Sequence, residues 1–183
     1  MPVPRLQIEH TALLVVDLQE KLVPHIHDYE TVVGQAARLI DGANALSLSV
    51  VVTEQYRKGL GDTVPQVAQR LPQQHARHEK LKFSACIEPV RRELSMCQAR
   101  TVLVCGIEAH VCVLQTCLDL LDAGFIPMVA VDAIGSRRES DRDSALTRMV
   151  QCGVLPGTVE SALLELVHEA GGSRFKAVLP LIR

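Results

Sequence analysis

Short apolar runs that alternate with stretches of helical periodicity constrain the fold of this chain most strongly. The first run, residues 12–16, contains only Ala, Leu and Val and ends at Asp17. Its length and its lack of polar alternation are typical of a strand buried on both faces of a sheet. Runs of the same character follow at residues 50–53, 101–105, 126–131 and, more briefly, 153–155. The pattern therefore predicts several buried parallel strands.

Apolar residues recur at helical spacing between these runs. The predicted helices cover residues 29–48, 87–96, 110–123, 140–152 and 158–170. Alternating strands and helices predict an α/β fold with helices on both faces of a parallel sheet. The polar stretch 54–80, punctuated by glycines and prolines, is predicted to be a loop with at most one short helix. Residues 1–183 are predicted to form a single domain.

Composition narrows the partners and the location. The formal net charge is −2 and the basic residues are scattered, so we expect neither nucleic acid nor an anionic membrane as a partner. No apolar run reaches the ~20 residues of a membrane-spanning helix, and the first residues lack the order of a signal peptide. The six cysteines include no CxxC pair, which argues against structural zinc. We expect a cytoplasmic protein.

Two side chains are placed where ligands of open parallel sheets bind, beyond the carboxyl ends of the strands. Asp17 closes the first strand, where a carboxylate is costly to bury unless it is paired or used, although it could also cap a helix or form a turn. Cys112 lies in the first turn of the helix after the third clear strand. A helix N-terminus favours the nucleophilic thiolate, but a cysteine at this position more often only packs. Lys82 has no local feature that distinguishes it from Lys80.

Three segments in this order resemble the isochorismatase-like hydrolases, a superfamily that includes nicotinamidases and N-carbamoylsarcosine amidase. The resemblance covers essentially the whole chain. The segments are LVVDLQ around Asp17, KLKFS around Lys82 and GIEAHVCVLQT around Cys112, of which the last is the most specific. The closest likeness is to the small isochorismatase-domain proteins without an assigned substrate, which TEQY at residues 53–56 and GLG at residues 59–61 also fit.

The resemblance implies a Rossmann-like, three-layer α/β/α fold with a six-stranded parallel sheet. It also implies a catalytic triad of Asp17, Lys82 and Cys112, and a cis peptide bond between Ile107 and Glu108. In such a site the backbone amides of Glu108 and Cys112 are expected to form an oxyanion hole. Family members form dimers or larger assemblies, so a homo-oligomer is expected here.

The chain also departs from the nicotinamidase pattern. Nicotinamidases carry a metal-binding Asp-x-His motif after the second strand, whereas this chain has Thr53, Glu54, Gln55 and Tyr56 there. We therefore expect no metal and no cofactor, because neither His25 with His27 nor His75 with His78 has a convincing third ligand. Substrate-pocket positions are predicted at Glu54, Gln55, Tyr56 and His110, although ordinary loop polarity explains the first three equally well.

These features predict a cysteine-dependent hydrolase of a small amide-like or related carbonyl substrate, with a covalent thioester intermediate. The cysteine favours a C–N bond over the vinyl ether that true isochorismatases cleave without a cysteine nucleophile. Two alternatives stay open. The chain could be a non-catalytic interaction or scaffolding protein with a vestigial pocket, or Cys112 could be a redox-sensing thiol.

Overall fold

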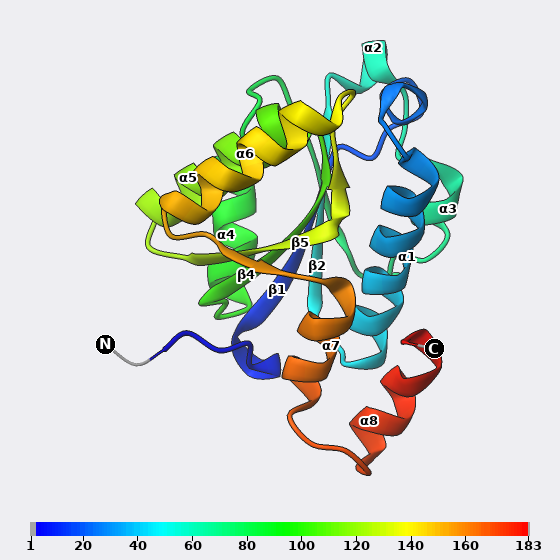
Figure 1. Cartoon of the computed structure of the whole chain (residues 1–183), viewed down its shortest axis with the longest axis vertical. Helices are drawn as coiled ribbons and strands as arrows, with labels where there is room; N and C mark the ends of the chain where they lie inside the picture. The colour runs from blue at the N-terminus through cyan, green and yellow to red at the C-terminus, as the bar shows by residue number, and fades with distance from the viewer. Residues whose placement is uncertain (1–2, 183) are drawn as a thin grey trace.

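A central sheet lies between two layers of helices in the computed structural model, which describes residues 3–182 (Figure 1). The sheet has six strands in the order β3-β2-β1-β4-β5-β6, and each pair of neighbours is parallel. The predicted three-layer α/β/α architecture is confirmed. The strands are β1 (Thr11–Val16), β2 (Ser49–Gln55), β3 (Ala76–Lys80), β4 (Thr101–Ile107), β5 (Ile126–Gly135) and β6 (Leu155–Gly157).

The helices divide between the two faces of the sheet. One layer holds α1 (Tyr29–Ala45), α3 (Pro65–Ala68), α7 (Val159–Val167) and α8 (Ser173–Val178), and the other holds α4 (Glu88–Met96), α5 (Leu114–Asp122) and α6 (Glu139–Gln151) (Figure 1). Shorter turns complete the chain: α2 (Arg57–Leu60), three 3₁₀ turns at Ile8–His10, Val23–His25 and Leu179–Leu181, and a π-helical turn at Ala109–Val113.

Alternating side chains of the central strands build two separate cores. Leu13 and Val15 of β1 belong to the core that α1 and α7 cover, whereas Leu14 and Val16 belong to the core that α4, α5 and α6 cover. All six residues of β1 are buried. A strand between two helical layers must bury both of its faces, which explains why β1 reads as one continuous apolar run.

The stretch 54–80 is more ordered than the sequence predicts. It contains α2, α3 and the edge strand β3, which pairs with β2 through Gln55 and Lys80 at its last position. Strand β3 has the sequence ARHEK, and its side chains are mostly exposed or half-buried until Lys80, which is buried. Because an edge strand can keep one face in water, it lacks the apolar run by which the other strands were predicted.

Glycine at position 106 allows the two central strands to approach closely beside Asp17. Gly106 pairs with Val16 and has φ +123°, in the region that favours glycine. A Cβ atom at this position would lie 2.0 Å from the Val16 carbonyl oxygen. The carboxyl ends of β1, β2, β3 and β4 therefore meet in one tightly packed region, and this region holds the candidate site.

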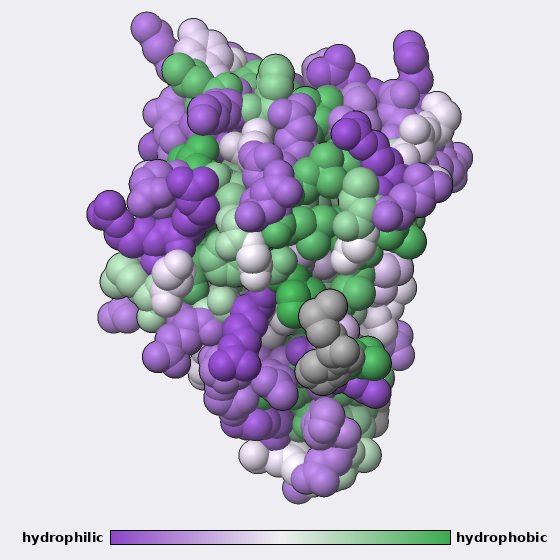
Figure 2. Space-filling model, turned by 90° about the vertical axis from the view of Figure 1, so that its left-hand side faces the viewer, coloured by the Kyte–Doolittle hydropathy of each residue, from purple (hydrophilic) through white to green (hydrophobic). Residues whose placement is uncertain are grey.

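The side of the molecule formed by α4, α5 and α6 mixes polar and apolar groups. Figure 2 shows apolar patches there that hydrophilic side chains divide. Among the described residues, no helix has both the length and the apolar character needed to cross a membrane.

Candidate active site

Asp17 is held at the end of β1 by groups from two other strands. Its carboxylate is fully buried, and its backbone lies in the left-handed region at φ +52°. The Thr53 hydroxyl donates to Asp17 Oδ1 at 2.9 Å, and the Lys80 ammonium donates to Oδ2 at 2.6 Å. Burial raises the pKa of Asp17, while the charge of Lys80 and the two hydrogen bonds oppose that rise. The strand-end rule thus identified a carboxylate in a constrained, water-poor position.

The lysine beside Asp17 is Lys80, and the prediction of Lys82 in that position is wrong. Lys80 Nζ lies 2.6 Å from Asp17 Oδ2 and 2.7 Å from Gln55 Oε1. It also donates to the backbone oxygens of Phe83 at 2.8 Å and of Lys82 at 3.3 Å. The side chain of Lys82 is exposed, because this residue lies two positions past the end of β3 on the surface loop.

Cys112 lies in the π-helical turn Ala109–Val113 that precedes α5, and its thiol is close enough to the Asp17 carboxylate for that group to act on its pKa. The cysteine is buried, with 6% of its surface exposed. Burial, and next the charge of Asp17, raises the pKa of Cys112 to about 12, although Lys80 and a backbone hydrogen bond from Glu108 act in the opposite direction. The expected stabilisation of a thiolate by the helix N-terminus is therefore outweighed by burial, and the resting thiol is protonated.

The turn that carries Cys112 begins at the Ile107–Glu108 peptide bond, which is cis in the structure. The backbone of Glu108 is hydrogen-bonded to the Cys112 sulfur. The Glu108 carboxylate lies 2.8 Å from Arg137 Nε, and His110 Nδ1 lies 2.9 Å from the Ser136 hydroxyl. Two consecutive residues of the segment after β5 therefore contact the residue that precedes the turn and one residue within it.

The predicted pocket positions have different roles in the structure. Glu54 is buried and accepts hydrogen bonds from the backbone and the hydroxyl of Thr63, at 2.8 and 2.7 Å. Gln55 is also buried, and its amide links Lys80 to the carbonyl of Leu81. Tyr56 is half-exposed, and His110 is partly buried beside Ser136. Glu54 and Gln55 thus support the site from within the fold.

Two supporting residues were not predicted from the sequence. The side chain of Gln19 accepts a hydrogen bond from the backbone N–H of Gln55 at 2.7 Å and donates one to the backbone carbonyl of Gln55 at 3.0 Å. These two bonds fix the end of β2. Thr116 donates to the Cys112 carbonyl at 2.6 Å and accepts from the Ala85 amide at 2.7 Å, which joins the cysteine turn to the segment after β3. Only their place beside Asp17 and Cys112 in the motifs could have pointed to them.

Clusters of metal-ligating side chains are not found in residues 3–182, where no three His, Cys, Asp or Glu side chains lie close enough to hold an ion. His75 Nδ1 lies 2.7 Å from the carbonyl of Pro72, and His78 lies 3.9 Å from Glu93. The two carboxylate oxygens of Asp17 instead accept hydrogen bonds from Thr53 and Lys80.

The family of the chain follows from comparison with known proteins. The model of the isochorismatase domain matches residues 11–161, so the chain belongs to the isochorismatase family. Isochorismatase domain-containing protein 2 of Danio rerio is 41% identical over 180 residues, which cover 97% of this chain and 89% of that protein.

Two further relatives are named as a secreted effector and as a ribonuclease. The secreted isochorismatase effector Isc1 of Phytophthora sojae is 40% identical over 182 residues, which cover 96% of this chain and 86% of that protein. The structure of the MAR1 ribonuclease of Caenorhabditis elegans has a TM-score of 0.94 and 42% identity, covering 98% of this chain and 92% of that chain. The fold and the family support a hydrolase role.

Proposed function

We propose that this chain is a cysteine-dependent hydrolase of a small amide-like substrate, and that it acts through a thioester on Cys112. The observation that carries the proposal is a chain of contacts. The Cys112 thiol lies close to the Asp17 carboxylate, which acts on its pKa, and this carboxylate lies 2.6 Å from the buried Lys80 ammonium. A nucleophile, a base and a group that orients the base are the elements of nucleophilic catalysis.

In the first half of the reaction, Asp17 accepts the proton of the thiol as the sulfur attacks the substrate carbonyl carbon. A base is needed because the raised pKa keeps Cys112 protonated at neutral pH. The raised pKa of Asp17 makes this carboxylate a stronger base than an exposed one. The carbonyl oxygen becomes an oxyanion, which we place at the backbone amides of Glu108 and Cys112.

Asp17 then donates its proton to the leaving nitrogen as the C–N bond breaks, which releases the amine and leaves a thioester. In the second half, the Asp17 carboxylate accepts a proton from water as the water attacks the thioester. The tetrahedral intermediate expels the Cys112 sulfur, which recovers its proton from Asp17, and the carboxylic acid product leaves. The Lys80 ammonium holds Asp17 in position. All four of its acceptors are groups of the chain itself.

Two other substrate or function classes must be separated from this proposal. The name of the C. elegans relative adds RNA phosphodiesters as a second substrate class. A non-catalytic interaction role is the alternative from a different class. A cytoplasmic location also stays a proposal, and the P. sojae relative, which is named a secreted effector, makes fractionation of cells a useful test.

The test is turnover of a defined substrate panel by matched cysteine variants. The panel contains primary amides, N-carbamoyl compounds and a short single-stranded RNA, and mass spectrometry follows both the products and the intact protein. We expect Cys112→Ala to lower amide turnover by at least about a thousandfold. Cys117→Ala changes another buried thiol just beyond the same turn and should retain turnover.

Each outcome separates the alternatives. Equal turnover by Cys112→Ala and the parent chain would exclude the thioester route. Products from RNA alone would replace the amide class with phosphodiesters. An acyl adduct on Cys112 would support the proposal directly, and the absence of both products and adducts across the panel would favour the non-catalytic role.

A further inference from the structure

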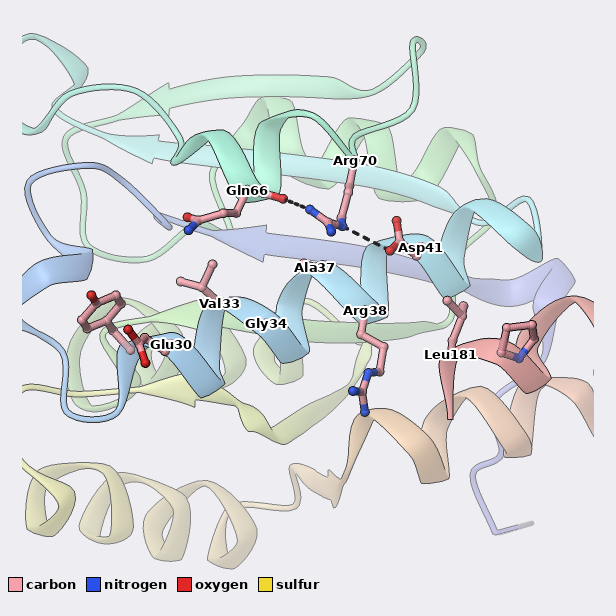
Figure 3. Close-up of a pocket in the computed structure, with 11 residues that line it drawn as sticks. Glu30, Val33, Gly34, Ala37, Arg38, Asp41, Gln66, Arg70 and Leu181 are labelled. Atoms are coloured by element: carbon pink, nitrogen blue, oxygen red, sulfur yellow. Dashed lines mark hydrogen bonds and ion pairs between the residues drawn. The ribbon is translucent and has the colours of Figure 1, made fainter. Parts of the chain in front are cut away.

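A groove of about 540 Å³ runs along the outward face of α1, on the helical layer opposite α4, α5 and α6 (Figures 1 and 3). Gln66 and Arg70 border it on one side, and Leu181 lies near one end (Figure 3). Val33, Gly34 and Ala37 of α1 contribute small apolar groups to it. Neither Asp17, Lys80 nor Cys112 lines this groove, so the active-site proposal leaves it without a role.

Gly34 and Gly42 of α1 differ in the space around the position where a side chain would begin. A Cβ atom on Gly42 would lie 2.3 Å from a methyl group of Leu163, so α7 packs closely against α1 at this glycine. A Cβ atom on Gly34 would meet nothing within 4 Å, although Gly34 lies inside a 17-residue helix, in its second turn. Glycine lowers the stability of a helix interior. Packing within this chain therefore gives no reason for glycine at position 34, while the close approach of another backbone would give one.

The charges around Gly34 have a symmetric arrangement. Glu30 lies four residues before Gly34 and Arg38 four residues after it, so all three share one face of α1 and all three are exposed (Figure 3). Glu30 and Arg38 are about 12 Å apart along the helix, too far to pair with each other. Within residues 3–182 neither forms an ion pair, whereas the neighbouring Arg70 and Asp41 pair at 3.2 Å.

We propose that two copies of this chain associate through α1, antiparallel and related by a two-fold axis that passes beside Gly34. Rotation about that axis brings Glu30 opposite Arg38 of the partner subunit, and Arg38 opposite Glu30 of the partner subunit. Each free charge then faces one opposite charge, and the same ion pair occurs twice in one isologous interface. The lack of a side chain on Gly34 lets the helices approach where they cross.

Other exposed groups of the face fit the same symmetry. Tyr29, of which 40% is exposed, is the largest apolar side chain at the start of α1. Across the two-fold axis its ring comes to the far half of the groove of the other copy, where Ala37, Pro180 and Leu181 offer apolar surface. An aromatic ring that enters a pocket of the partner is a common anchor of protein interfaces.

The test is a charge swap followed by sedimentation velocity over a concentration series. We expect the parent chain to dimerise, and Glu30→Arg and Arg38→Glu each to raise the dimer Kd by at least about tenfold, because like charges then face each other. The double variant Glu30→Arg with Arg38→Glu restores opposite charges and should return the Kd to within a few-fold of the parent value. Gly34→Leu should weaken the dimer most, by steric exclusion.

The matched control is Arg148→Glu, which reverses an exposed charge of α6 on the other helical layer. It should leave the Kd unchanged, and circular dichroism should show native helix content in every variant. A chain that stays monomeric up to high concentration would overturn the proposal. So would an oligomer whose Kd ignores both single variants, or a double variant that shows no rescue. None of these measurements depends on turnover, so the proposed hydrolase activity stands or falls separately.

Discussion

Two pairs of opposite charges in this molecule are held in contrasting ways. Asp17 and Lys80 are buried, lie 2.6 Å apart and come from strands that are brought together only by the fold. Glu30 and Arg38 are exposed, come from one helix and find no charged partner in the part of the chain that the structure describes. The first pair is satisfied within one chain, and the second has the arrangement that the proposed two-fold contact with another copy would pair.

The contrast follows from the cost of desolvation. A buried ion must be compensated inside the fold, so Thr53, Gln55 and two backbone carbonyls surround the Asp17–Lys80 pair. An exposed ion is compensated by water and can exchange that water for a partner at low cost. The Asp17–Lys80 pair is therefore compensated inside the fold, whereas Glu30 and Arg38 stay available for the contact proposed with a second copy.

The largest expected effect comes from breaking the buried pair. Lys80→Met leaves the Asp17 carboxylate buried without its counter-ion, which should lower the free energy of unfolding by about 3–5 kcal/mol. The same change should lower any Cys112-dependent turnover by about a thousandfold, because Asp17 would then be held protonated. Urea denaturation measures the first quantity without requiring a known substrate.

Lys82→Met is the matched control, since it removes an exposed ammonium two residues away. Its unfolding free energy should stay within about 0.5 kcal/mol of the parent value. If Lys82→Met were as damaging as Lys80→Met, the geometry around Asp17 would not describe the working site.

The assignment of this lysine also shows where prediction from sequence fails. The buried strands β1, β2, β4 and β5 could be predicted because each is an apolar run. Strand β3 is polar on its exposed face, so residues 76–80 were interpreted as loop. Once β3 is in place, the strand-end rule that selects Asp17 also selects Lys80, its last residue. With β3 recognised, the strand-end rule would have favoured Lys80 over Lys82, the residue that the family resemblance implied.

Prediction of the site was limited in a second way. The position of Cys112 after β4 could be predicted, but its environment could not. A helix N-terminus alone favours the thiolate and would lower the pKa of Cys112. Burial in the π-helical turn raises that pKa instead. Burial depends on residues such as Thr116 and Ala85, which lie far apart in sequence and meet only through tertiary contacts.

The second prediction concerns the pH dependence of Cys112. A thiol whose pKa is raised to about 12 stays protonated below that value, so the rate of its alkylation by iodoacetamide should rise about tenfold per pH unit from pH 7 to 10. A peptide thiol with an ordinary pKa of about 8.5 levels off within that range. In Lys80→Met the rate should fall further, because a positive charge that favours the thiolate is lost.

Peptide mapping of the alkylated protein measures this rate for Cys112 separately from the five other cysteines. The pH dependence of turnover should show a second change, at acidic pH. Activity that requires the Asp17 carboxylate should decline as the pH falls through a pKa above the usual value near 3.9. An alkylation rate that is already constant between pH 7 and 8 would indicate a preformed thiolate and contradict the role of Asp17 as the base.

The smallest expected effect tests the other half of the comparison, the exposed face of α1. In dilute solution, where the chain is monomeric, Gly34→Ala should raise the free energy of unfolding by about 0.5–1 kcal/mol, because alanine is the better helix former. Gly42→Ala should lower it by about 1–3 kcal/mol, since the new Cβ would overlap Leu163. At concentrations that favour the dimer, the gain from Gly34→Ala should shrink as the methyl group separates the two helices. A gain that is the same at every concentration would show that no second copy packs against Gly34.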